Sequence, residues 1–211
     1  MGVLVMVLGP SGSGKSTSLR HVGYEGTMVF GSTGKRLPFK GSALSVHAHA
    51  GYRDIYDALV ANKARRYVVD DSTYLMQFDN FAHARERGYD KFVTMALSFE
   101  TLLDAATRTN EDTTVYLLHH PSFADDGSCK PQTIGKMLDN QLCIEGLCDC
   151  ILECAVEEGE HVFYTNERGI AKTPYGMFAE RTIPNDLALV DKTIRDFWGM
   201  GPVGGDETHE G

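Results

Sequence analysis

Directly after an apolar run at residues 3–8, the chain carries the segment Gly9-Pro10-Ser11-Gly12-Ser13-Gly14-Lys15-Ser16-Thr17. Its first eight residues read G-x-x-x-x-G-K-S, the spacing of a phosphate-binding P-loop. In such a loop, a buried strand leads into a glycine-rich turn whose backbone N–H groups face inward. A helix N-terminus then adds partial positive charge. We therefore expect residues 9–17 to bind the phosphates of a nucleotide.

The individual side chains of this segment suit that task. Gly12 and Gly14 permit a close approach of the backbone to phosphate, and Lys15 reaches the β- and γ-phosphates. The Ser16 hydroxyl is a ligand for Mg²⁺, and Thr17 is a spare hydroxyl. A dinucleotide-binding fingerprint fits less well, because its third glycine would stand where Thr17 is.

Length and composition favour a single α/β domain. The chain has 211 residues, a formal net charge of -9 and a hydrophobic fraction of 42%. The N-terminal apolar run is too short to span a bilayer and no basic segment precedes it, so we expect a cytoplasmic protein without a membrane segment. The negative charge disfavours nucleic-acid binding unless a basic face is segregated from the acidic ones.

The cysteines are odd in number and cluster late in the chain, which argues against a secreted disulfide framework. They are Cys129, Cys143, Cys148, Cys150 and Cys154. A zinc site is one interpretation, but paired C-x-x-C knuckles are missing. Small buried hydrophobic residues are the favoured interpretation.

A second apolar strand, beginning at Tyr67, ends in the carboxylates Asp70 and Asp71, the pattern called Walker B. At the carboxyl edge of a parallel sheet, Asp70 would hold Mg²⁺ through its water shell and Asp71 would lie near the attacking water. The alternative is a pair of surface turn aspartates.

Two further segments bear on the nucleotide site. The strand predicted at 113–121 ends at His119 and His120, either of which could sense the γ-phosphate, although a histidine in such a place is more often structural. The basic segment Gly34–Gly41 either binds a partner or is a solvated turn, and the solvated turn is favoured.

The remaining pattern predicts further elements and the domain boundary. A short strand is expected at 27–30, and a hairpin is expected from strands at 150–156 and 162–165. Helices are expected at 54–61 with Asp54 as N-cap, at 88–109, at 135–148 and at 187–198. The ATP-binding domain would then span 1–198, followed by a disordered, acidic, glycine-rich tail at 199–211.

With these segments in place, the chain resembles the bacteriophage RecA-like P-loop ATPases described as AAA-family ATP-binding proteins, related to phage single-strand-annealing ATPases. The resemblance covers nearly the whole chain and rests on segments 12–17, 34–41, 69–76, 88–92, 133–139, 175–178 and 183–187. It implies a RecA-like core with a mostly parallel sheet flanked by helices, and ATP with Mg²⁺ as ligands. It also implies a role in phage DNA recombination or replication on single-stranded DNA, in the cytoplasm of an infected host.

The resemblance also bears on sheet order and on catalysis. RecA-like and AAA-like proteins insert a strand between the P-loop strand and the strand with the Mg²⁺-associated aspartate, whereas P-loop kinases and GTPases commonly place these strands side by side. RecA-type recombinases carry a glutamate after the second strand, where this chain reads Phe30-Gly31-Ser32-Thr33. Water activation would then fall to Asp71, or hydrolysis is slow.

RecA-like and AAA-like ATPases commonly complete the site with a basic residue of a neighbouring subunit, which predicts a homo-oligomer. Lys136 is the candidate for this role, and the alternative is a surface lysine. Two other functions remain open. One is a small-molecule kinase, for which no compact arginine-bearing lid is evident, and the other is a nucleotide-binding assembly or regulatory protein with little turnover.

Overall fold

The structure is a computed structural model that describes residues 1–125, 127–134 and 142–203. Its helical elements are η1 (Ser16–His21), α1 (Tyr52–Val60), α2 (Thr73–Ala82), α3 (Asp90–Thr107), α5 (Ile144–Leu147) and α6 (Leu187–Trp198). Its strands are β1 (Val3–Leu8), β2 (Thr27–Gly31), β3 (Val46–Ala48), β4 (Arg66–Asp70), β5 (Thr114–His119), β6 (Pro121–Phe123), β7 (Cys129–Pro131), β8 (Cys150–Glu157), β9 (Glu160–Tyr164) and β10 (Thr182–Pro184).

The central sheet has eight strands in the order β10-β9-β8-β1-β5-β4-β2-β3. The six strands from β8 to β3 pair in parallel, whereas β9 and β10 are antiparallel additions at one edge. The predicted α/β fold with a mostly parallel sheet and a C-terminal hairpin is confirmed. Strand β5 lies between β1 and β4, which is the inserted strand expected of a RecA-like core.

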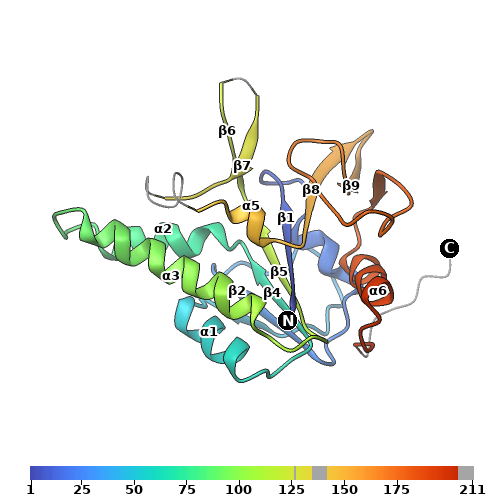
Figure 1. The fold of residues 1–211 in the computed structure, drawn as a ribbon, viewed down its shortest axis with the longest axis horizontal. Coiled ribbons are helices and arrows are strands. Elements are labelled where there is room, and N and C mark those ends of the chain that lie inside the picture. Colours follow the sequence, from blue (N-terminus) through green and yellow to red (C-terminus); the bar gives the residue numbers. More distant parts are fainter. Residues whose placement is uncertain (126, 135–141, 204–211) are drawn as a thin grey trace.

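Helices cover both faces of this sheet (Figure 1). In β1, Leu4, Met6 and Leu8 pack in one hydrophobic cluster with residues of α1 and α3. Val3, Val5 and Val7 pack in a second cluster with residues of η1 and α6. A strand buried on both faces needs apolar residues at every position, and this explains why β1 reads as a continuous apolar run.

Several local predictions differ from the structure. Helix α1 begins two residues earlier than expected, so Asp54 is its third residue and accepts a hydrogen bond from the Gly51 N–H at 2.9 Å instead of acting as the N-cap. Helix α2 and the β6–β7 hairpin were not predicted. Of the helix expected at 135–148, the structure describes α5, and residues 135–141 lie outside the described part.

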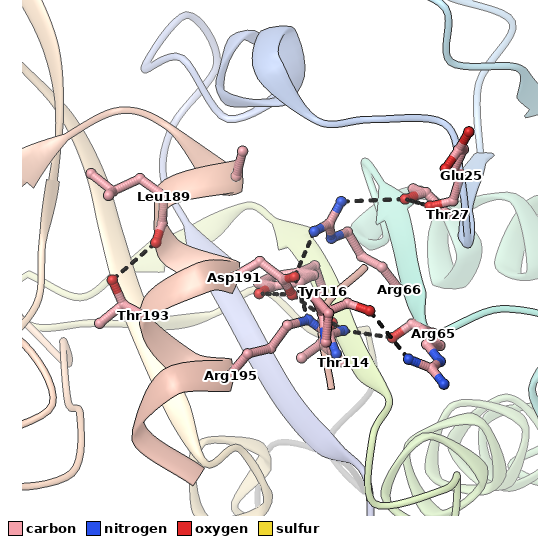
Figure 2. Close-up of polar contacts among 12 residues, drawn as sticks. Glu25, Thr27, Arg65, Arg66, Thr114, Tyr116, Leu189, Asp191, Thr193 and Arg195 are labelled. Atoms are coloured by element: carbon pink, nitrogen blue, oxygen red, sulfur yellow. Dashed lines mark hydrogen bonds and ion pairs between the residues drawn. The ribbon is translucent and has the colours of Figure 1, made fainter. Parts of the chain in front are cut away.

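A buried polar cluster fastens α6 to the sheet (Figure 2). Asp191 of α6 accepts hydrogen bonds from Arg66 of β4 and from Arg195, each at 2.6 Å. It also accepts from the hydroxyls of Thr114 at 2.7 Å and Tyr116 at 2.8 Å. Asp191 is fully buried, so its charge is stable there only because these donors surround it.

The chain continues in contact with the domain beyond α6. The Gly201 carbonyl accepts from Arg195 at 2.8 Å, the Gly201 N–H donates to Asp112 at 3.0 Å, and the Pro202 carbonyl accepts from Arg65 at 3.1 Å. The sequence predicts a disordered tail from residue 199, whereas the backbone groups of Gly201 and Pro202 have polar partners in the structure. Residues 204–211 lie outside the described part.

Candidate functional site: a P-loop beside the β4 carboxylates

The glycine-rich loop follows β1 at the carboxyl edge of the sheet and leads into η1, a single short 3-10 helix. Gly12 and Gly14 have φ angles of 81° and 104°, in the left-handed region that favours glycine. The Ser18 N–H donates to the Gly14 carbonyl at 3.0 Å and closes the turn into η1. The glycine-rich loop predicted from the G-x-x-x-x-G-K-S spacing thus lies directly after β1.

Lys15 folds back over this loop. Its Nζ donates to the carbonyl oxygens of Gly9 at 2.7 Å and Pro10 at 3.1 Å, and the residue is 4% exposed. Burial lowers the pKa of Lys15, while the negative charge of Asp71 opposes that shift. A buried ammonium at the base of the loop is a ready partner for phosphate oxygens.

Ser16 and Asp70 meet across the end of the sheet. The Ser16 hydroxyl donates to Asp70 Oδ1 at 2.8 Å, joining η1 to β4. Burial raises the pKa of Asp70, and the neighbouring Asp71 carboxylate adds to the shift, so a cation here would stabilise the ionised form. Mg²⁺ is usually held by one or two protein oxygens together with waters and substrate phosphates, and this pair fits that requirement.

Asp71 stands just beyond β4 in a left-handed backbone conformation, with a φ of 57°, and is 8% exposed. Its carboxylate lies 3.3 Å from His120 Nε2 through Oδ1 and 3.3 Å from Lys35 Nζ through Oδ2. The His120 hydrogen bond, assisted by Lys35, lowers the pKa of Asp71. Asp71 is therefore held as a carboxylate between two basic groups.

The two predicted histidines occupy different environments. His119 is fully buried, with Nε2 2.8 Å from the Gln132 carbonyl and Nδ1 2.8 Å from Ser72 Oγ. Because a carbonyl only accepts, Nε2 carries a proton, while Nδ1 faces the Ser72 hydroxyl, which also lies 3.1 Å from the Leu118 carbonyl oxygen. His119 is thus engaged within the protein, whereas His120 turns toward Asp71 and the ring of Tyr74.

Side chains of the β8–β9 hairpin contact the backbone of the glycine-rich loop. His161 Nδ1 lies 2.8 Å from the Ser13 carbonyl oxygen, and Cys154 Sγ lies 3.1 Å from the same atom. A Cβ on Gly14 would lie 2.7 Å from the His161 ring, so glycine is required there for space as well as for φ. No motif spacing in the sequence links His161 to the loop.

Lys35 was also missed, because the segment 34–41 was interpreted as a solvated turn. The sequence feature that could have identified Lys35 is its position shortly after β2, because β2 ends at the same edge of the sheet as β4. Lys136 lies outside the described residues. Pro10, Ser11 and Gly12 are exposed at the tip of the loop, Ser13 is buried and Thr17 is half-buried.

Within the described ranges, no group of three or more His, Cys, Asp or Glu side chains is arranged to hold a metal ion. A magnesium site here would consequently draw its remaining ligands from water and phosphate. Cys148, Cys150 and Cys154 are buried in the two hydrophobic clusters. The same part of the chain contains no helix with the length and apolar character needed to cross a bilayer.

Comparison with known proteins finds similarity in structure. No family model and no curated protein matches the sequence. Among solved structures, the chain is similar to a KaiC-like protein, PH0186, from the hyperthermophilic archaeon Pyrococcus horikoshii OT3. The two are 15% identical, the match covers 87% of this chain and 85% of that chain, and the TM-score is 0.44.

Proposed function

We propose that the protein binds ATP with Mg²⁺ and hydrolyses it. The observation that carries this proposal is the contact between Ser16 of the P-loop and Asp70 at the end of β4, 2.8 Å apart, beside the buried ammonium of Lys15. These groups come from distant parts of the sequence and meet where a nucleotide's terminal phosphates and their cation would lie.

Each residue has a defined task in this proposal. Lys15 and the loop N–H groups bind the β- and γ-phosphates, and Ser16 and Asp70 hold Mg²⁺, which neutralises phosphate charge. Asp71, paired with His120, orients the attacking water. Oxygen from that water bonds to the γ-phosphorus while the bond from the γ-phosphorus to the β–γ bridging oxygen breaks. The water's protons pass to the phosphate oxygens and to solvent, and ADP and inorganic phosphate leave.

The first experiment measures ATP binding and phosphate release with Mg²⁺ for the unaltered protein, Lys15→Ala and Lys192→Ala. Lys192 is an exposed residue of α6 and serves as the matched control. We expect Lys15→Ala to abolish tight binding, because the loop loses its buried ammonium, and Lys192→Ala to behave like the unaltered protein. Equal affinity in all three proteins would overturn the proposal.

Added nucleosides and single-stranded DNA separate the classes of function. A phosphorylated nucleoside would identify a kinase, and stoichiometric binding without turnover would identify an assembly or regulatory protein. The resemblance to phage RecA-like ATPases leads us to propose stimulation of phosphate release by single-stranded DNA. Unchanged turnover over a range of DNA lengths and salt concentrations would count against the role in recombination or replication.

The same resemblance leads us to propose a homo-oligomer in which Lys136 contributes to a neighbouring site. If so, a mixture of Lys15→Ala and Lys136→Ala chains regains turnover at interfaces that pair an intact P-loop with an intact Lys136. Full activity of Lys136→Ala alone would contradict this role.

A further inference from the structure

The loop after β2 brings a second lysine to the P-loop site. Lys35 Nζ lies 3.3 Å from Asp71 Oδ2 and 5.4 Å from the centre of the Tyr74 ring. The two partners differ in exposure, since the side chain of Lys35 is 66% exposed and that of Asp71 is 11% exposed. The ammonium is thus solvent-accessible, whereas the carboxylate it contacts is nearly enclosed.

The backbone that precedes Lys35 is held against β4 and His49. The Ser32 N–H donates to the Asp70 carbonyl at 3.2 Å, continuing the pairing of β2 with β4. Gly34 lies against His49, such that a Cβ at Gly34 would be 2.6 Å from His49 Nε2. A long flexible side chain on a fixed base can change partner without a movement of the backbone.

The charge of Lys35 interacts with the charged groups of the proposed phosphate site. The Asp71 charge is the main cause that raises the pKa of Lys35, and it is also the strongest charge that acts on Lys15. Lys35 in turn lowers the pKa of Lys15, so the two ammoniums are close enough to repel each other. The charges of Lys15 and Lys35 therefore both act on the Asp71 carboxylate beside the loop.

We propose that Lys35 is a substrate-binding residue that leaves Asp71 for the γ-phosphate when a nucleoside triphosphate binds to the same chain. The inference deepens the proposed function and rests on it. A diphosphate lacks the γ-phosphate and leaves the Lys35–Asp71 pair in place. A triphosphate frees Asp71 Oδ2 for water while Oδ1 stays with His120.

The balance of interactions supports this exchange of partners. An ion pair with one solvent-exposed member contributes little net stabilisation, so little is lost when Lys35 leaves Asp71. A terminal phosphate offers several charged oxygens to the ammonium, and charge-assisted bonds of this kind are about twice as strong as neutral ones.

The test compares the affinities for ADP and for a non-hydrolysable ATP analogue in Lys35→Met, Lys35→Arg and Lys40→Met. Lys40 is exposed in the same segment and serves as the matched control. We expect Lys35→Met to weaken binding of the ATP analogue about tenfold and that of ADP less than about twofold, because only the triphosphate reaches Lys35. Lys35→Arg should recover most of the difference, and Lys40→Met should show none.

An unchanged ratio of the two affinities in Lys35→Met, with tight Lys15-dependent binding, would overturn this inference alone. Failure of the unaltered protein to bind either nucleotide would overturn the proposed function as well. Mixing tests the assignment to one chain: a mixture of Lys35→Met and Lys15→Ala should bind the ATP analogue no more tightly than Lys35→Met alone, since no chain then has both lysines. Recovery of the original affinity in the mixture would show that Lys35 acts on a neighbouring subunit and would overturn the assignment.

Discussion

His161 donates from Nδ1 to the carbonyl oxygen of Ser13 at 2.8 Å, and this contact ties the β8–β9 hairpin to the phosphate-binding loop. The two residues are 148 positions apart in the sequence. Because the Ser13 carbonyl is held by the hairpin, the N–H groups of the same peptide segment are held in direction as well. The hairpin thus helps to set the shape of the loop before any nucleotide arrives.

Replacing His161 tests this support. We expect His161→Leu to weaken nucleotide binding about three- to tenfold, which corresponds to the loss of one net hydrogen bond of about 1 kcal/mol. His161→Asn should bind nearly as the unaltered protein does, because the asparagine amide places a donor close to the position of Nδ1. Titration with a fluorescent ATP derivative measures both, and equal losses in the two variants would contradict the role of the hydrogen bond.

Asp191→Asn should destabilise the fold strongly. Removing the one carboxylate leaves Arg66 and Arg195 buried without their shared counter-ion, which typically costs about 3–5 kcal/mol. Urea denaturation measures the loss. Asp196→Asn, at an exposed position of α6, should change the free energy of unfolding by less than about 0.5 kcal/mol. Similar losses for the two variants would show that helix charge, not the buried cluster, governs stability.

The free energy of unfolding should decrease as the pH falls, because His119 is buried in its neutral form. Burial lowers the pKa of His119 from 6.5 to about 4 in the folded protein, so the unfolded chain binds the proton first as the pH falls. The contribution is fully present above the unfolded pKa and is lost progressively below it. Between pH 7 and pH 5 the free energy of unfolding should decrease by about 2 kcal/mol from this group.

His119→Gln removes the titrating ring and serves as the reference for that measurement. The decrease between pH 7 and pH 5 should be smaller in His119→Gln by about the same 2 kcal/mol, because the other groups titrate in both proteins. Parallel pH profiles would mean that His119 does not titrate as its burial implies.

Two C-terminal truncations test the contacts beyond α6. A chain ending at Val203 keeps the bonds of Gly201 and Pro202 to Arg195, Asp112 and Arg65, whereas a chain ending at Gly199 loses them. We expect the shorter chain to be less stable than the longer one by about 1–3 kcal/mol, since Arg195 and Asp112 lose buried partners. Identical thermal unfolding of the two would argue against the docking of residues 200–203.

Much of the fold is predictable from local pattern. The apolar run of β1, the glycine loop after it and the carboxylates after β4 are each recognisable within a few residues, and Asp186 marks the start of α6 by its N-cap bonds. Helix α2 escapes prediction because its apolar residues face both ways: Leu75 and Met76 are buried, whereas Phe78 and Phe81 are exposed. Such a segment lacks the one-sided stripe that identifies a helix.

Only the site residues that belong to a short sequence motif can be predicted from the sequence. Lys15, Ser16, Asp70 and Asp71 follow from motifs, although strand pairing is needed to bring them together. The role of Lys35 depends on β2 lying beside β4, and that of His161 depends on β8 lying beside β1. Neither adjacency is encoded within a short stretch of sequence, so these two residues become visible only in three dimensions.

The buried cluster around Asp191 also has a consequence for how the chain is made. Arg66 and Asp191 are 125 positions apart, and Asp191 is among the last residues of the domain to leave the ribosome. Until it emerges, Arg66, Thr114 and Tyr116 have no carboxylate to bind, so the central strands cannot enclose the guanidinium at low cost. We therefore expect a nascent chain that ends before α6 to remain open and accessible to chaperones, and its core to close only after synthesis has reached the final helix.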